Sequence, residues 1–139
     1  MSKYKKLTIY TDGGARGNPG PAGVGAVLKD ENGETIATVS EFIGEATNNQ
    51  AEYKAVIAAL RKAKQFKASE IQVYLDSELV SEQLNQKYKI KNKELAPLFV
   101  QIWNLTIGID KITYKHIPRE QNQEADKLVN LAIDRALRN

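Results

Sequence analysis

The order of the strand-like and helix-like segments constrains most strongly how this chain can fold. Alternating, β-branched segments predict five strands, at residues 7–11, 24–28, 35–43, 71–75 and 111–116. Apolar residues at helical spacing predict four helices, at about 48–66, 77–86, 94–106 and 121–137. Turn-forming residues join the first three strands into an antiparallel meander, whereas the later strands are separated by helices and require crossovers. We therefore expect an α/β fold with helices on the faces of a mixed sheet, in a single domain covering residues 1–139.

The composition limits which metal ions the chain can bind. It contains no cysteine and a single histidine, so disulfides and thiolate zinc sites are excluded and a histidine zinc site is disfavoured. A bound metal would therefore have oxygen ligands, which suit Mg²⁺, Mn²⁺ or Ca²⁺. The formal charge of +3 mildly favours a polyanionic partner.

The apolar segments are short. None approaches the ~20 residues of a membrane span, and residues 7–10, behind a basic N-terminus, are too few for the core of a signal peptide. We therefore expect no membrane partner and a cytoplasmic location.

Four acidic residues occupy positions that suggest a shared role. Asp12 and Asp76 stand where two predicted strands end, and ligands of open α/β sheets gather at such ends. Glu52 lies on the apolar stripe of its predicted helix, one turn before the core positions, and Asp126 extends an apolar flank towards the start of the last helix. Acids at these places are costly unless they are paired or bind a metal.

Each of these acids also has a purely structural explanation. Aspartate is common at strand ends because it forms turns, and an acid in the first turn of a helix is favoured by the helix dipole. If the four converge, however, they form a site of hard oxygen ligands for Mg²⁺. Two such ions about 3.5–4 Å apart can activate a water and stabilise the leaving oxygen of a phosphodiester. Convergence would therefore predict phosphoryl-transfer chemistry.

Motifs in series along nearly the whole chain resemble those of type 1 ribonucleases H. They are Thr11-Asp12-Gly13-Gly14 with the glycine- and proline-rich run 17–23, then segments 47–52, 74–77 and 122–126. The resemblance implies the ribonuclease H-like fold, a five-stranded mixed sheet flanked by helices. It also implies a metal-dependent endonuclease that hydrolyses the RNA strand of RNA–DNA hybrids.

The resemblance also implies the roles of individual residues. Asp12, Glu52, Asp76 and Asp126 would be catalytic and hold two Mg²⁺, with Mn²⁺ as a substitute. The hybrid duplex would be bound by the backbone at Gly13 and Gly14 and by polar side chains. RNA 2′-hydroxyls would be contacted by Asn18, Asn48 and Gln50. A DNA-strand phosphate would be held by Thr47 and Asn92, and Ser77 would bind the duplex beside the second aspartate. Asn18 has an alternative role as a turn residue, and Asn48 as a helix cap.

Two residues compete for an auxiliary catalytic role. Many members of the family have a mobile histidine ten residues before the last aspartate, and His116 stands at this distance from Asp126. The alternation of Ile112, Tyr114 and His116 places His116 on a strand, however. Arg119 resembles the Pro-Arg element of members that lack the histidine, so we favour Arg119. Its structural alternative is an exposed ion pair with a nearby glutamate, which contributes little stability.

The chain also departs from the family pattern. Only the connector 87–93 stands where some bacterial members insert a basic protrusion, and its lysines, Lys87, Lys89, Lys91 and Lys93, suit either a phosphate backbone or solvent. We expect no hybrid-binding domain before residue 7. Glu78 follows the second aspartate motif where an amide is frequent, and Trp103 is expected in the core.

Two other functions are compatible with the fold class. A DNA-processing nuclease, such as a junction resolvase or an integrase core, is disfavoured by Asn18 and by residues 47–49. An inactive or weakly active nucleic-acid-binding relative is the main alternative, although all four acids are present. We expect the protein to be monomeric.

Overall fold

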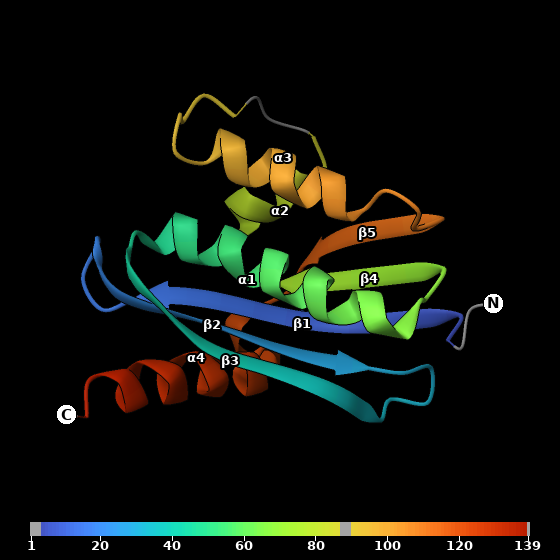
Figure 1. The fold of residues 1–139 in the computed structure, drawn as a ribbon, viewed down its shortest axis with the longest axis horizontal. Helices are drawn as coiled ribbons and strands as arrows, with labels where there is room; N and C mark the ends of the chain where they lie inside the picture. Colours follow the sequence, from blue (N-terminus) through green and yellow to red (C-terminus); the bar gives the residue numbers. More distant parts are fainter. Residues whose placement is uncertain (1–3, 87–89, 139) are drawn as a thin grey trace.

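The computed structural model describes residues 4–86 and 90–138, and a five-stranded mixed sheet lies at its centre (Figure 1). The order across the sheet is β3-β2-β1-β4-β5. The first three strands pair antiparallel, and β4 and β5 extend the sheet in parallel from β1. Their bounds are β1 Lys6–Ala15, β2 Gly20–Lys29, β3 Thr35–Ala46, β4 Glu70–Leu75 and β5 Lys111–His116.

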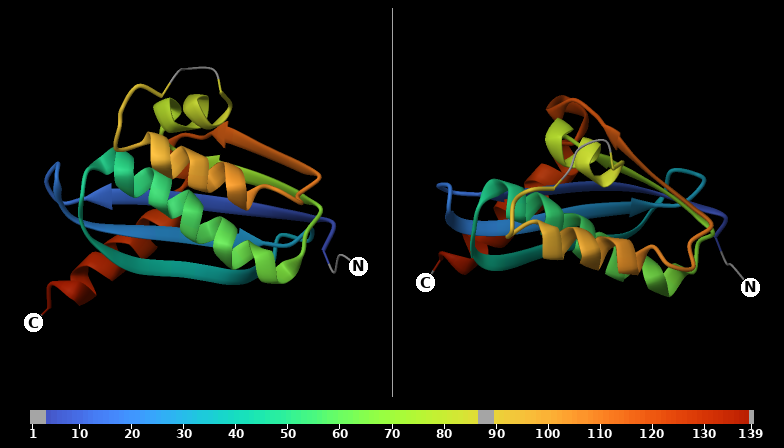
Figure 2. Two further views of the ribbon diagram at one scale, coloured as in Figure 1. Left: turned by 45° about the horizontal axis from the view of Figure 1, so that its top comes forward. Right: turned by 90° about the horizontal axis from the view of Figure 1, so that it is seen from above.

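Helices lie on both faces of the sheet (Figure 2). The helix α1 (Asn48–Ala63), followed by the 3₁₀ turn Lys64–Phe66, crosses one face, with α3 (Ala96–Leu105) beside it. The short helix α2 (Glu78–Leu84) packs near β5 on the same side. The last helix, α4 (Gln123–Ala136), begins after the 3₁₀ turn Arg119–Gln121 and packs on the opposite face, against β2 and β3. No helix in these two described stretches is long and apolar enough to cross a membrane.

The main core lies between α1 and the sheet, where the inward-facing side chains of alternating strand positions meet the apolar stripe of the helix. Its largest fully buried members are Tyr53, Leu7, Ile9, Leu28, Leu60, Leu75, Ile102, Val24, Val56 and Val73. The Tyr53 hydroxyl donates a hydrogen bond to Gln83 Oε1 at 2.6 Å, and burial raises the pKa of this tyrosine to about 12. The core fixes α1 on the sheet, and α1 carries Glu52.

The expected mixed sheet with helices on both faces is confirmed, but β1 is longer than the sequence predicted. It continues to Ala15, which pairs with Ala22 of β2. The expectation that Asp12 ends its strand is therefore wrong, because Asp12 lies within β1 and pairs with Gly25. Only Asp76 directly follows the last residue of its strand, Leu75.

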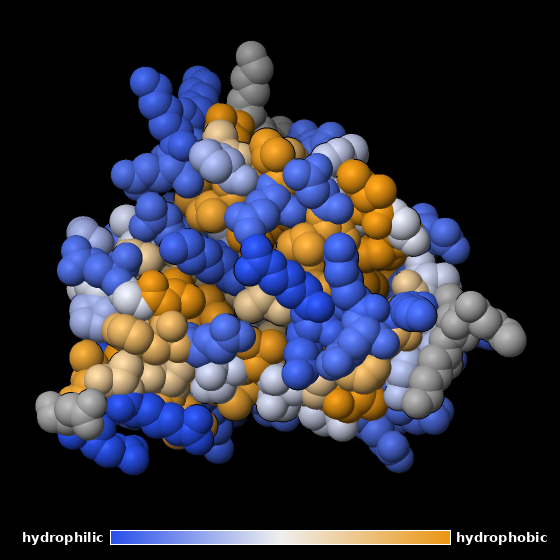
Figure 3. Space-filling view, viewed as in Figure 1, coloured by the Kyte–Doolittle hydropathy of each residue, from blue (hydrophilic) through white to orange (hydrophobic). Residues whose placement is uncertain are grey.

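The expectation that Trp103 belongs to the core is also wrong. Its side chain is 55% exposed, whereas the adjacent Ile102 is 2% exposed. Hydrophobic side chains reach the surface in the region of α3 (Figure 3), and Val100 and Ile107 are among them. Because α3 is mostly apolar and only Ile102 of its residues is fully buried, its hydrophobic composition could not indicate which face packs inwards.

Candidate active site

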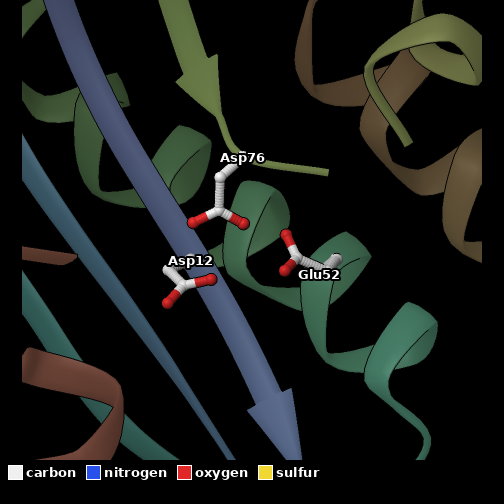
Figure 4. Close-up of side chains that lie close together, drawn as sticks. All are labelled: Asp12, Glu52 and Asp76. Carbon is white, nitrogen blue, oxygen red and sulfur yellow. The ribbon is translucent and has the colours of Figure 1, made fainter. Parts of the chain in front are cut away.

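Asp12, Glu52 and Asp76 form a compact acidic cluster. The strands β1 and β4 run parallel side by side, with Thr11 opposite Leu75, so the residues that follow these two positions are neighbours. The first turns of α1 bring the Glu52 side chain to the same place (Figure 4). One carboxylate oxygen from each residue can be chosen so that all three lie within 4.8 Å of one another. Three segments far apart in the sequence thus deliver one acid each.

Gly13 explains how α1 comes so close to β1. A Cβ atom at this position would lie 2.1 Å from the carbonyl oxygen of Ala51. Only glycine therefore permits this approach, which places Glu52, the next residue of α1, beside Asp12. The backbone amide of Gly13 also hydrogen-bonds the Glu52 carboxylate and favours its charged form. At Gly14 the nearest atom to an added Cβ is 3.9 Å away, in Val129, so that position is not crowded.

The electrostatics of the cluster favour a cation. Burial raises the pKa of Asp12 to about 7, with the charge of Asp76 and the nearby Asp126 carboxyl adding to the increase. Burial, together with the charges of Asp12 and Asp76, also raises the pKa of Glu52 well above its ordinary value. The residues are 7% and 8% exposed, respectively, and Glu52 Oε2 is buried without a hydrogen-bond partner among the described residues. Without a cation, this arrangement is costly, since like charges and burial both oppose ionisation.

Asp126 lies beside this cluster but is not part of its tightest group. It occupies the first turn of α4, where its amide donates to the carbonyl of Asn122 at 3.2 Å, and its side chain is exposed. It lines the same cavity as Val129 and Ile133, the apolar residues whose flank it was expected to continue. All four predicted acids nevertheless line one open cavity of about 200 Å³.

The two auxiliary candidates differ in whether they line this cavity. Arg119 lines it together with the four acids, whereas His116 is not among its lining residues. His116 is the last residue of β5, as its alternation predicted, and pairs with Leu75. Among the described residues no ion pair involves Arg119, and Glu124 pairs instead with Lys29 at 3.3 Å.

The predicted substrate-binding residues near the start of α1 form one hydrogen-bond network. Asn18, in the loop between β1 and β2, accepts a bond from the amide of Asn48 at 3.0 Å, and Asn48 Oδ1 accepts one from Ala15 at 2.9 Å. The helix cap is Thr47, which forms a capping box with Gln50. In both asparagines the oxygen makes the structural contact, so the exposed side-chain amide remains available as a donor.

The remaining predicted contacts also have structural roles. Ser77 caps α2 by accepting a hydrogen bond from Val80 at 3.2 Å. Asn92 Oδ1 accepts from the amide of Glu94 at 2.7 Å, in the turn before α3. The carboxylate of Glu94 in turn accepts from Gln50 Nε2 at 3.1 Å. In the connector, Lys91 and Lys93 are exposed, and Lys87 and Lys89 lie outside the described residues.

Three polar residues at or beside the site were not predicted from the sequence: Arg16, Asn130 and Asn122. Arg16 lines the acidic cavity and is held by Asp134 of α4 at 2.7 Å and by Asn130 at 3.3 Å. Asn122 is buried and donates hydrogen bonds to Asp76 and to the backbone beside Asp12. No local pattern marked Asn122 as part of the site, because an asparagine near a helix start is explained as a cap, although its side chain makes no capping hydrogen bond here.

Comparisons with known proteins agree with this geometry. The model of the reverse transcriptase-like family matches residues 10–132. The bifunctional protein Rv2228c of Mycobacterium tuberculosis is 45% identical over 132 residues, which cover 94% of this chain and 36% of that protein. The chain thus spans little more than a third of that relative. A ribonuclease H of Chlorobium phaeovibrioides is 32% identical over 145 residues, covering 93% of this chain and 96% of the relative.

A solved structure of a similar protein has the same fold. The crystal structure of LC11-RNase H1 in complex with an RNA/DNA hybrid has a TM-score of 0.90 and 47% identity, and the match covers 94% of this chain and 99% of that one. The family-model match, the full-length match to a ribonuclease H and this structural likeness agree with the resemblance of the sequence motifs. This chain belongs to the ribonuclease H family.

Proposed function

We propose that the chain is an endoribonuclease that hydrolyses the RNA strand of RNA–DNA hybrids with the help of two divalent cations. The observation that carries this proposal is the convergence of Asp12, Glu52 and Asp76 from three segments, with Asp126 lining the same cavity. Family membership supports it, as does the hybrid bound in the related LC11-RNase H1 structure. The inactive nucleic-acid-binding alternative is not favoured, because all four acids are in place.

The donor set fits Mg²⁺, with Mn²⁺ as a substitute. All four acids provide hard oxygens, and the partnerless Glu52 Oε2 and the raised pKa of Asp12 indicate a cluster that a cation would stabilise. Asp12, Glu52, Asp76 and Asp126 would hold the ions, which supply an activated water and stabilise the leaving oxygen of the phosphodiester. The acids would also align the ions with the scissile phosphate.

The chain's other polar residues would select and orient the hybrid. The free side-chain amides of Asn18 and Asn48, with Gln50 and the backbone at Gly13 and Gly14, would read the 2′-hydroxyls that distinguish RNA from DNA. Thr47, Ser77 and Asn92 would contact the sugar–phosphate backbone. Arg119 would contact the scissile phosphate or draw away the product, and it cannot transfer protons at neutral pH because it stays charged.

The test compares a labelled RNA–DNA hybrid with duplex DNA and duplex RNA of the same sequence. We expect cleavage of only the RNA strand of the hybrid, in Mg²⁺ or Mn²⁺, and none in excess EDTA. Undiminished cleavage in EDTA would overturn the metal mechanism, and binding without cleavage in either metal would favour the inactive relative. Gel filtration with light scattering would test the expected monomer.

A further inference from the structure

One buried amide, that of Asn122, connects the segments that carry three of the four acids. Its Nδ2 donates to the carbonyl oxygen of Thr11, the residue before Asp12, at 2.8 Å. The same nitrogen donates to Asp76 Oδ2 at 3.1 Å. Its backbone carbonyl accepts the 3.2 Å hydrogen bond from the amide of Asp126 that starts α4.

The chemistry of this position favours asparagine. Both side-chain partners are acceptors, so the amide nitrogen must face them and the orientation of the group is fixed. A hydroxyl could donate to only one of the two, and an aspartate would add a further negative charge to the acidic cluster. The side chain is 1% exposed, and within the described residues its Oδ1 has no hydrogen-bond partner. Burying that oxygen costs stability, so the favourable contribution of this side chain comes from the two hydrogen bonds of its nitrogen.

The bond to Asp76 has a direct consequence for cation binding. A carboxylate held at Oδ2 cannot rotate freely about its Cβ–Cγ bond, so its other oxygen is directed before a cation arrives. Partners of this kind orient metal-binding carboxylates, and their loss typically weakens metal affinity or activity by about 10–100-fold. The bond to Thr11 adds to this effect, because it fixes the end of β4 relative to β1.

We infer that Asn122 is a positioning residue, which through its hydrogen bond to Asp76 sets the affinity of the acidic cluster for its divalent cation. This inference rests on the proposed function, since it assumes that Asp76 binds the metal. Asn122 need not touch substrate or cation, and it acts on the free protein before any hybrid binds. The effect is therefore measurable without catalysis.

The test measures Mn²⁺ binding to the full chain by calorimetry, with free Mn²⁺ followed by electron paramagnetic resonance. We expect Asn122→Ala to bind Mn²⁺ at least about 10-fold more weakly than the wild type. With a hybrid substrate, its rate should recover as the metal concentration rises, and KM for the hybrid should change little. Asn122→Ser, which keeps one donor, should show a smaller loss and serves if the alanine variant does not fold.

The matched control is Ser40→Ala. Ser40 Oγ donates to the carbonyl of Leu128 at 2.6 Å. Like Asn122→Ala, this variant therefore removes a side-chain hydrogen bond that anchors a segment carrying an acid, in this case α4. The lost bond lies away from the acidic cluster. It should lower the melting temperature and leave the Mn²⁺ affinity unchanged. If a folded Asn122 variant binds Mn²⁺ as tightly as wild type does, the inference is overturned while the proposed function stands. A wild-type chain that binds no Mn²⁺ would overturn both.

Discussion

At the scale of single residues, the buried acids that suit a metal site also lower the stability of the metal-free fold. Asp12 and Asp76 repel each other across adjacent strands, and burial adds to the cost of charging Asp12. Replacing either by asparagine keeps the shape and removes one charge. We expect a loss of at least about 10²-fold in the rate of hybrid cleavage, comparable to losing a strong electrostatic contact in the transition state. The melting temperature measured in EDTA should stay the same or rise.

The control for these variants is Asp110→Asn, which removes the same charge next to the start of β5, at the end of the parallel strands away from the acids. It should retain wild-type turnover. If Asp12→Asn and Asp76→Asn both retain near-normal turnover at saturating Mg²⁺, the proposed site is wrong.

Replacing Arg119 and replacing His116 should affect catalysis to different extents. Because Arg119 lines the acidic cavity and His116 does not, Arg119→Ala should lower kcat more than His116→Ala does. The measurement is kcat of both variants over a range of pH. A larger loss of kcat for His116→Ala than for Arg119→Ala, across that pH range, would identify His116 as the working residue instead.

The acids could be selected from the sequence, but the groups that hold them could not. An acid on an apolar stripe, such as Glu52, conflicts with its local pattern and is conspicuous for that reason. Asn122 has no such conflict, because an asparagine before a helix is explained by capping alone. Its contact with Asp76 spans 46 positions in the chain and depends on how the fold brings the end of β4 to the start of α4. Arg16 was missed for the same reason, since its partners lie on α4.

At the scale of elements, the contact between β1 and α1 sets the position of Glu52 relative to Asp12. Substitutions at two adjacent glycines can test this. At Gly13 an alanine Cβ would lie 2.1 Å from Ala51 O and would push apart the two elements that carry Asp12 and Glu52. Such overpacking typically costs about 1–3 kcal/mol, so Gly13→Ala should lower the free energy of unfolding by that amount and reduce Mg²⁺ binding.

Gly14→Ala provides the matched control, because its added Cβ would meet nothing closer than 3.9 Å. Its free energy of unfolding should stay within about 0.5 kcal/mol of the wild type. Urea denaturation of the three proteins is the measurement. Equal stability of the two alanine variants would show that β1 and α1 do not need this close approach.

The sequence predicted the elements better than it predicted where they end. Strand β5 has the expected bounds because a proline follows it closely and its pattern alternates. Strand β1 extends past Asp12 through Gly13 and Gly14, which have little strand preference of their own. Pairing with β2 as far as Ala15↔Ala22 holds them there, and this interaction is between strands rather than local. Likewise, the buried face of α3 is decided by α1, which the sequence of α3 cannot reveal.

At the scale of the whole molecule, the acidic cluster links stability to pH and metal concentration. The pKa of Asp12 is about 7 in the folded protein and lies near 3.8 in an unfolded chain. Between these values the folded state holds a proton that the unfolded state has released, so the metal-free protein loses stability as pH rises from about 4 to about 7. The raised pKa of Glu52 acts in the same direction. Divalent cations bind the deprotonated acids, so they stabilise most at high pH.

This linkage can be measured by thermal denaturation of wild type and Asp12→Asn, in EDTA and in Mg²⁺, at pH 4.5, 6 and 7.5. In EDTA, the asparagine variant should be clearly more stable at pH 7.5, and its advantage should shrink as pH falls, because protonated Asp12 carries no charge either. In Mg²⁺ the wild type should gain more than the variant, and the gain should grow with pH. Comparing the two proteins at each pH cancels the titration of all distant groups. If the stability difference between the two proteins stays constant from pH 4.5 to 7.5 in EDTA, Asp12 ionises normally. The cluster would then lack the repulsion and burial cost from which its affinity for a cation was inferred.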